Sequence, residues 1–333
     1  MAFVISLTYY YLKKRIVYKR WIVVLSFAIY ILIHLILFFI IPKESIYVDR
    51  WSVITSFWDY AIQGKYPYYA TSFAGNAPGP MPFYFVLALP FYFFGEIGLF
   101  SLTGLILTIY FFYKTKDKDS FFYILLLLIT SPAIFWEIST RSTILINSTL
   151  MLIIFYYIKK IELLNKKSFW LTAIFGGLLL STRTVYSLIF LIWGIYVLKN
   201  QILPFTRLFK WTSIFLLSFM FTFVPLIIFY YNDFFIMNPF IIQSSSLIPS
   251  NILPFLYLFA IILSFFCKKA NDVIFLGGII LFVSILVYFV FHATSIDIKE
   301  AFLGRTIDIS YFIFSIPFLL YTSNDSKKNI RNS

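Results

Sequence analysis

The chain has 333 residues, of which 61% are hydrophobic and only 12% are charged. An ordinary soluble domain carries about 25% charged residues, so this composition excludes a protein with a normal water-facing surface. The formal net charge of +13 does not indicate nucleic-acid binding, because most Lys and Arg residues lie in short clusters between apolar runs. Loops on the cytoplasmic side of membrane proteins collect such residues. We therefore expect a chain that contacts membrane lipids and binds no nucleic acid.

The first apolar run, residues 22–41, matches the length of about 20 residues that a helix needs to cross a bilayer. It ends at Ile41-Pro42-Lys43 without a small-residue cleavage site, which favours an uncleaved span over a signal peptide. Helices satisfy their own backbone groups in lipid, and the runs do not alternate as barrel strands do. Further spans are predicted at 97–113, 120–136, 142–158, 169–181, 184–198, 211–231, 252–267, 273–291 and 307–322.

These runs predict an all-α polytopic membrane protein, with one domain over residues 1–333 and about 10–11 transmembrane helices. The basic clusters place the N-terminus and a short tail, residues 323–333, in the cytoplasm. The protein is thus expected in the inner or plasma membrane. Residues 81–95 do not fit this alternation: either they form a short or re-entrant helix, or the basic cluster 114–118 lies outside. We favour the short helix.

Two glycine pairs and one short loop stand out within the apolar runs. Gly176-Gly177 and Gly277-Gly278 are expected to let helices pack closely. The short apolar segments 169–181 and 184–198 meet at Ser181-Thr182-Arg183-Thr184, which places a cation at membrane depth. Such a charge usually has a partner or a water-filled cavity.

The first outer loop, residues 42–80, is long for a membrane protein and has a distinctive order of residues. Asp49 follows the first span, and residues 51–62 carry apolar side chains at helical spacing, which predicts a helix lying in the membrane interface. A turn, Gly64-Lys65-Tyr66-Pro67-Tyr68, comes next, and Pro78-Gly79-Pro80 leads into the following apolar segment. The loop is therefore expected to be folded on the membrane surface.

This order of acid, surface helix, Gly-x-x-Pro-Tyr turn and proline-rich entry resembles the GT-C superfamily of glycosyltransferases, and most closely its bacterial mannosyltransferase-like branch. The resemblance covers residues 45–95 and is only topological elsewhere. It implies an envelope enzyme that takes a hexose, such as mannose, from a polyprenyl-phosphate carrier. The sugar passes to a hydroxyl of a glycan or lipid acceptor at the extracytoplasmic face.

Two departures from that family bear on domains and cofactors. We expect no extra-membrane C-terminal domain of the kind that many relatives carry, and Asp49 is followed by Arg50 rather than by a second acid. A divalent cation is therefore an open option, and no other cofactor is expected. Two histidines and one cysteine, widely separated, give no zinc-binding spacing. The lipid-linked sugar itself is the expected donor substrate.

Asp49 is the candidate catalytic base, by its position and by the resemblance. Transfer of a sugar to a hydroxyl needs a carboxylate that removes the acceptor proton, and direct displacement at the sugar C1 carbon inverts the anomeric configuration. The alternative interpretation is that Asp49 and Arg50 only mark the end of the first span. Asp59 is a second acid, but it falls on the polar side of the predicted surface helix.

Cationic side chains are needed where negative charge develops on the leaving phosphate. Arg183 is the first candidate for this role. Arg141 is a second, although an ion pair with Glu137 or a position at the interface explains it equally well. Lys65 in the Gly-Lys-Tyr-Pro-Tyr turn is a third, and a solvated loop lysine is a nearly equal alternative for it.

The last outer loop adds His292 and Arg305 as candidate substrate-binding residues. His292 lies at an outer helix end, where a water-facing histidine is an equal alternative. Arg305 lies three residues before Asp308, and a simple ion pair between the two is the alternative interpretation. His34, inside the first span, is expected to be a packing residue. Two other function classes stay open: a polysaccharide polymerase or ligase working from the late loop, and a flippase or transporter for lipid-linked sugars.

Overall fold

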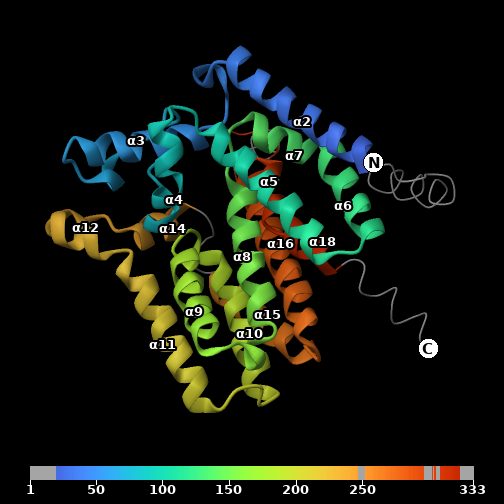
Figure 1. Cartoon of the computed structure of the whole chain (residues 1–333). Coiled ribbons are helices and arrows are strands. Elements are labelled where there is room, and N and C mark those ends of the chain that lie inside the picture. The colour runs from blue at the N-terminus through green and yellow to red at the C-terminus, as the bar shows by residue number, and fades with distance from the viewer. Residues whose placement is uncertain (1–19, 247–251, 296–301, 303, 305–307, 323–333) are drawn as a thin grey trace.

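The computed structural model describes residues 20–246, 252–295, 302, 304 and 308–322, and within these ranges the chain is helical and contains no strand. The prediction of an all-α fold is confirmed. Figure 1 shows a bundle of steep helices with α2 and α3 lying across one end. The helices of the first half are α2 (Arg20–Ile40), α3 (Arg50–Ile62), α4 (Pro82–Phe93), α5 (Gly98–Thr115), α6 (Lys118–Thr130), α7 (Pro132–Ser139) and α8 (Ile144–Ile158). Those of the second half are α9 (Lys166–Leu180), η4 (Thr184–Tyr186), α10 (Ser187–Lys199), α11 (Phe205–Phe221), α12 (Val224–Phe229), α13 (Tyr231–Ile236), α14 (Pro239–Ser246), α15 (Leu253–Phe266), α16 (Ala270–Ser295), η5 (Ile309–Phe314) and α18 (Ile316–Thr322).

Helix α8 forms the core of the bundle. Almost all of its side chains are buried, and it packs against α5, α9, η5 and α18. A helix that is apolar all round is stable only when it is enclosed, and the sequence of α8 has this character. The other close pairs are α9 with α11, α10 with α15 and α16, and α16 with α18.

Two helices, Gly98–Thr115 and Ala270–Ser295, are long and apolar enough to cross a membrane. A third span results if α6 and α7 are counted together, although they meet at 60°. Further apolar helices of 10–17 residues accompany them within the described ranges: Val24–Ile40, Pro82–Phe93, Ile144–Ile158, Thr184–Lys199, Leu253–Phe266 and Ile309–Thr322.

Two predicted spans are not single straight helices. The segment 120–136 bends at Ser131, because Pro132 offers no N–H to continue α6 and the Ser131 hydroxyl accepts from the Ile134 N–H at 3.4 Å to start α7. The segment 211–231 also breaks: α11 ends at Phe221, and α12 begins at Val224 in Figure 1 as a separate arm. Pro225 at the start of α12 suits a helix start and not a helix interior.

The segment 81–95 forms the short helix α4 of 12 residues, as expected. It packs against α3, α5 and α9. The chain leaves it at Gly95, whose φ of +77° is in the left-handed region that favours glycine. Helix α4 therefore brings the first loop into contact with the bundle.

Several basic loops meet at one end of the bundle. The amines of Lys116 and Lys159 both contact Tyr321, the first through its carbonyl and the second through its hydroxyl. The Lys199 amine donates to the Phe265 carbonyl at 2.7 Å. Clusters that are far apart in sequence are thereby gathered on one side, with the residues of the first loop at the other.

Helices α9 and α11 touch at the level of the backbone. A Cβ atom added at Gly177 would lie 2.1 Å from the carbonyl oxygen of Phe215. Only glycine permits this approach, so the expected role of Gly177 in close packing is confirmed. At the second pair, a Cβ atom on Gly277 would meet Ile189 at 2.7 Å.

Candidate functional site

Asp49 stands directly before α3 and is buried, with 3% of its surface exposed. Its Oδ2 accepts hydrogen bonds from the Ser72 hydroxyl at 2.6 Å and from the Asn76 amide at 2.7 Å. Its Oδ1 accepts no hydrogen bond from any residue in the described ranges. The carboxylate is thus held firmly through one oxygen, and the other is available to a ligand.

The two donors come from one tight loop. The Ser72 N–H donates to the Asn76 carbonyl at 2.9 Å, and the Gly75 N–H donates to the Ser72 carbonyl at 2.9 Å. Gly75 has a φ of +81°, so the loop turns at a residue that tolerates the left-handed conformation. This turn places the Ser72 and Asn76 side chains on the same oxygen of Asp49.

The Gly-Lys-Tyr-Pro-Tyr element holds the first loop against the rest of the chain. The Tyr66 hydroxyl donates to the Met237 carbonyl at 2.8 Å, and the Tyr68 hydroxyl donates to the Pro80 carbonyl at 3.0 Å. Both rings are buried. Lys65 instead is exposed and donates to the Gln63 side chain at 2.9 Å, away from any cavity that the structure describes.

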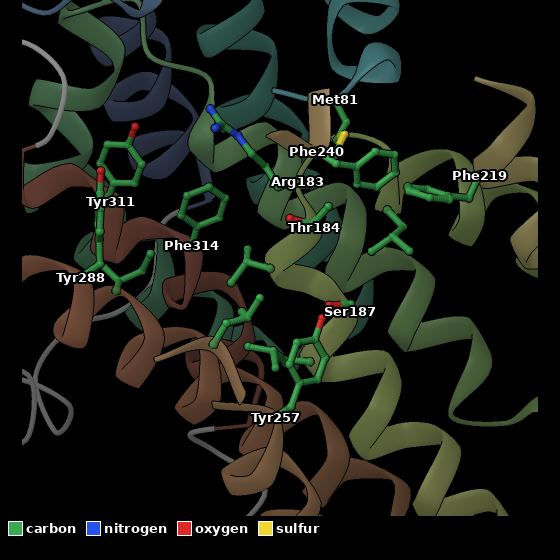
Figure 2. Close-up of a pocket in the computed structure, with 15 residues that line it drawn as sticks. Met81, Arg183, Thr184, Ser187, Phe219, Phe240, Tyr257, Tyr288, Tyr311 and Phe314 are labelled. Carbon is green, nitrogen blue, oxygen red and sulfur yellow. Dashed lines mark hydrogen bonds between the residues drawn. The ribbon is translucent and has the colours of Figure 1, made fainter. Parts of the chain in front are cut away.

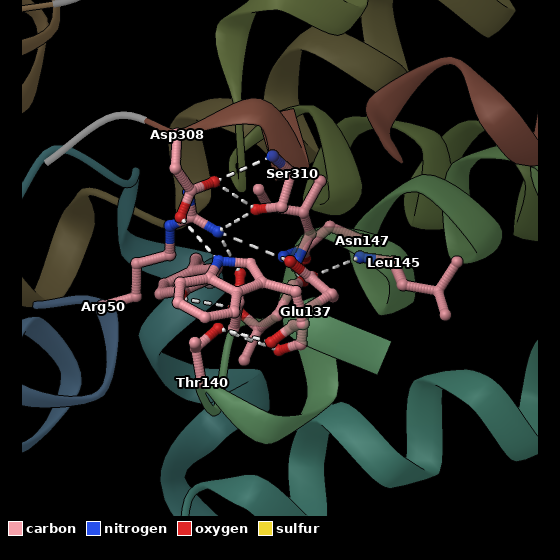
Figure 3. Close-up of polar contacts among 12 residues, drawn as sticks. Arg50, Glu137, Thr140, Leu145, Asn147, Asp308 and Ser310 are labelled. Atoms are coloured by element: carbon pink, nitrogen blue, oxygen red, sulfur yellow. Dashed lines mark hydrogen bonds and ion pairs between the residues drawn. The ribbon is translucent and has the colours of Figure 1, made fainter. Parts of the chain in front are cut away.

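Arg50 is the centre of a buried charge cluster (Figure 3), which consists of Arg50, Glu137, Ser142, Asp308 and Ser310. Its guanidinium lies 2.9 Å from the Asp308 carboxylate and 3.4 Å from that of Glu137. Buried charges are tolerated only with such partners. The cluster joins three distant parts of the chain: the first loop, the α7–α8 corner and the start of η5.

Each carboxylate of the cluster also holds backbone. The Glu137 Oε1 accepts from the N–H groups of Ile144 and Leu145, at 2.6 and 3.1 Å, and so caps the start of α8. The Asp308 Oδ1 accepts from the N–H and hydroxyl of Ser310. Burial opposes ionisation of Asp308, but Arg50 and the Ser310 hydrogen bonds outweigh it and hold the pKa of Asp308 below its ordinary value.

Arg183 is placed quite differently. It lies at the junction of α9 and η4, and its guanidinium lies 5.5 Å from the centre of the Tyr84 ring. Its buried Nε has no hydrogen-bond partner, and no carboxylate in the described ranges forms an ion pair with it. The Met81 N–H donates to the Thr182 carbonyl at 3.2 Å, so the first loop is attached beside this arginine.

Arg183 faces two cavities of similar size. The larger has a volume of about 360 Å³ and an almost wholly apolar lining from α9, α10, α11, α14, α15, α16 and η5. Figure 2 shows Arg183 at one end of it, while Ser187 and Tyr257, whose hydroxyls lie 2.6 Å apart, are at the other. We call this the apolar cavity. Its lining includes Leu180, Leu188, Phe219, Phe240, Leu253, Ile285 and Phe314.

The second cavity, of about 330 Å³, is more polar and contains Asp49 and Arg50. We call it the polar cavity. The turn at Gly75, the residues before α4 and one face of α14 form its other walls. Three side chains line both cavities: Arg183, Tyr288 and Tyr311. The structure therefore brings Asp49 and Arg183, 134 positions apart in sequence, to one pair of adjoining cavities.

Arg141 has partners that the sequence did not indicate. Its guanidinium pairs with Glu96, at 2.7 and 3.2 Å, and donates to the carbonyls of Phe38 and Ile41 at the end of α2. The expected alternative, a pair with Glu137, is wrong, because Glu137 turns to Arg50 and to the α8 N-terminus. Arg141 lines neither cavity and attaches α2 to the bundle.

The remaining candidates are less well placed. His292 is half-buried on α16, and its ring lies 4.7 Å from that of Tyr288. It therefore supports a residue that lines both cavities but lines neither itself. Arg305 lies outside the described residues. Asp308, the partner suggested for it, pairs with Arg50. Asp59 is exposed, as expected, and accepts a hydrogen bond from the Tyr92 hydroxyl at 2.6 Å.

His34 is buried, as expected of a packing residue, and lies between Tyr30 and Phe135. Sequence reasoning missed Arg50, Glu137, Asp308, Tyr288 and Tyr311. A signal existed for the first three, because each charge stands at the edge of a predicted apolar span. Nothing in the sequence singles out the two tyrosines among 25.

The donors around Asp49 do not favour a divalent cation. The Oδ2 atom of Asp49 already accepts hydrogen bonds from the Ser72 hydroxyl and the Asn76 amide. The next residue in the chain is the cationic Arg50. In the part of the chain that the structure describes, no group of three or more His, Cys, Asp or Glu side chains could hold a metal ion. We therefore assign no chemical step to a metal.

Comparison with family models, with curated proteins and with solved structures finds no match to this chain.

Proposed function

We propose that this chain is a multi-spanning membrane glycosyltransferase that moves a hexose from a polyprenyl-phosphate carrier to an acceptor hydroxyl. The observation that supports it most is the pair of cavities that share Arg183. One is apolar and suits a lipid chain, and the other is polar and is lined by a buried carboxylate. The half-buried cation of Arg183, which has no acidic partner in the described ranges, stands between them. A lipid-linked sugar has this same order of chain, phosphate and sugar.

We base the proposed membrane topology on the distribution of basic residues along the chain. The gathered basic loops mark the cytoplasmic side, and both cavities lie near the opposite ends of α9 and α10. In the described ranges, two long helices, the bent pair α6–α7 and six shorter apolar helices give nine candidate crossings. We propose that they belong to a membrane bundle of about 10–11 helices, some of them short. The sugar would then be transferred at the extracytoplasmic face.

In the proposed complex the isoprenoid chain occupies the apolar cavity and the phosphate lies at Arg183. A guanidinium is well suited to this task, because its planar array of donors matches phosphate oxygens. Tyr288 and Tyr311, which line both cavities, lie beside the phosphate and the sugar. The acceptor enters the polar cavity and presents its hydroxyl to Asp49.

The reaction is a single displacement at the sugar C1 carbon. The acceptor oxygen forms a bond to C1, and its proton passes to the Oδ1 of Asp49. The bond between C1 and the phosphate oxygen breaks, and its electron pair stays on that oxygen, where Arg183 stabilises the charge. The products are a glycoside with inverted configuration and the free carrier phosphate.

A sugar-transfer assay on purified protein in lipid tests this proposal. The substrates are labelled polyprenyl-phosphate hexoses and simple glycan or lipid acceptors. We expect the wild-type chain to release carrier phosphate, and the Asp49→Asn variant to do so about 10²–10⁴-fold more slowly, the usual contribution of a general base. Asp59→Asn is the matched control, because that acid is exposed and lines neither cavity. It should retain wild-type activity.

Release that persists in a folded Asp49→Asn variant would remove Asp49 from the mechanism. Specific binding of the carrier sugar by wild type with no turnover under any acceptor would contradict the enzyme and favour transport of the same ligand. A product with retained configuration would exclude the single displacement.

A further inference from the structure

A third cavity, of about 290 Å³, lies at the end of the bundle opposite Asp49, between the first turns of α9 and α11. Its lining consists of Lys166, Phe169, Trp170, Thr206, Arg207 and Lys210. We call it the inner basic cavity. No acid lines it, and its three cations form no ion pair within the described ranges. Nothing in the proposed transfer reaction uses these residues.

The positive charges at this place are not balanced by acids on the two helix ends. Helix N-termini carry a partial positive charge and usually have acids in the first turn, but the first turns of α9 and α11 contain none. Lys166, Lys167 and Arg207 stand there instead. Because α9 and α11 pack side by side, two positive helix ends and several cations converge on one cavity.

The surroundings of the cavity indicate a lipid rather than a free anion. Trp170 and Phe169 line it, and the Arg207 guanidinium lies 4.6 Å from the centre of the Phe169 ring. Along the two helices above it, apolar side chains are exposed: Leu171, Ile174 and Phe175 on α9, and Phe209, Leu216, Leu217, Met220 and Phe221 on α11. An aromatic ring at headgroup depth beside an apolar strip is the usual arrangement at a membrane interface.

We propose that the inner basic cavity binds the headgroup of an anionic phospholipid of the cytoplasmic leaflet. The phosphate lies among Lys166, Arg207 and Lys210, with the Thr206 hydroxyl as a further donor, and the acyl chains run along the exposed apolar strip of α9 and α11. Basic cavities between helices on the cytoplasmic side recognise such headgroups. The proposal requires the membrane topology given above, but it is independent of any sugar transfer.

Native mass spectrometry of delipidated protein tests it, with phosphatidylglycerol, phosphatidylcholine and inorganic phosphate as probes. We expect wild type to retain one phosphatidylglycerol in preference to phosphatidylcholine. The Arg207→Gln/Lys210→Gln variant should bind it about thirtyfold more weakly, since each basic side chain near an anionic lipid contributes about 1 kcal/mol. Arg207→Lys keeps the charge and should retain most of the affinity.

The matched control is Lys268→Gln/Lys269→Gln, which removes two exposed cations from the same end of the bundle but from outside the cavity. It should bind phosphatidylglycerol as wild type does. An equal loss in this control would overturn the proposal, because the binding would then depend on the total basic charge. Equal binding of phosphatidylcholine, or full occupancy by inorganic phosphate alone, would overturn it as well.

A second measurement covers the case in which the double variant does not fold. Phosphatidylglycerol with brominated acyl chains should quench tryptophan fluorescence in wild type, and Trp170→Phe should remove that part of the quenching. Quenching that is unchanged in Trp170→Phe would place the lipid elsewhere and contradict the site.

Discussion

Two arginines line the polar cavity, the buried Arg50 and the half-buried Arg183, and they differ in what contacts their guanidinium groups. The Nε of each has no hydrogen-bond partner in the described ranges, but Arg50 has two carboxylates and two hydroxyls around its terminal nitrogens, whereas Arg183 lies against the face of one aromatic ring. A buried charge without partners is costly. From this difference we infer that Arg50 serves the fold, and we propose that Arg183 binds a charge that the chain does not supply.

The largest effect is expected when Arg50 is removed. Arg50→Met leaves Asp308 and Glu137 buried without their cation, and loss of one partner of a buried pair costs about 3–5 kcal/mol. We expect a large fall in thermal stability, measured by intrinsic fluorescence in detergent. Arg50→Met/Asp308→Asn should recover part of it, and no recovery would show that the two side chains act independently.

Arg183 should behave in the opposite way. We expect Arg183→Gln to keep or raise the melting temperature while the rate of carrier-phosphate release falls about 10²–10³-fold, the usual effect of removing a group that stabilises developing negative charge. The matched control is Arg141→Gln, which removes an arginine bound to Glu96. It should lose stability by about 1.5–3 kcal/mol and keep the chemistry. A stability loss in Arg183→Gln would refute the contrast.

A smaller effect is expected from filling the apolar cavity. Val185→Phe adds bulk to the wall of this cavity. It should lower kcat/KM for long-chain donors about tenfold, equivalent to about 1.4 kcal/mol. The decrease in kcat/KM should be smaller for donors with a short chain. The control is Val86→Phe, because Val86 is exposed on α4 and outside both cavities. Equal effects on short and long donors would place the carrier chain elsewhere.

The smallest predicted effect is a dependence on pH in the Arg50 cluster. Because the pKa of Asp308 is held below 3.8 in the fold, its ionised form stabilises the native state above pH 3.8. That contribution to the free energy of unfolding is lost as the pH falls through the lowered pKa. Its size is about 1.4 kcal/mol for each unit of difference between the folded and unfolded pKa values. The melting temperature measured from pH 6 to pH 3 should therefore fall less steeply in Asp308→Asn. Equal slopes would contradict it.

Periodicity predicted the local features of the fold well. In the predicted apolar stripe of residues 51–62, Trp51, Ile54 and Phe57 are buried on α3, whereas Ile62 at its end is exposed. The paired short helices meet at Arg183 as expected. Both are determined by the spacing of apolar side chains within about 20 residues. The breaks at Ser131 and after Phe221 were missed, because hydropathy alone does not separate a bent apolar segment from a straight one.

The partners of the charged residues could not be predicted, since they depend on contacts far apart in sequence. Arg50 and Asp308 are separated by 258 positions. For Arg141 the nearby Glu137 was the obvious partner, but the backbone at Arg141 has a φ of +57°, and this left-handed turn sends the guanidinium to Glu96 instead. Asp49 lines the polar cavity, while its role as the base stays a prediction.

The contact of Gly177 with the Phe215 backbone joins α9 and α11 into one closely packed pair of helices. Because the two backbones touch at Gly177 and the helices pack along each other, we expect them to move together. At one end, this pair of helices carries the basic side chains of the inner basic cavity. At the other end, Leu180 and Phe219 form part of the wall of the apolar cavity. We therefore expect a displacement of the first turns of α9 and α11 to move these walls of the apolar cavity.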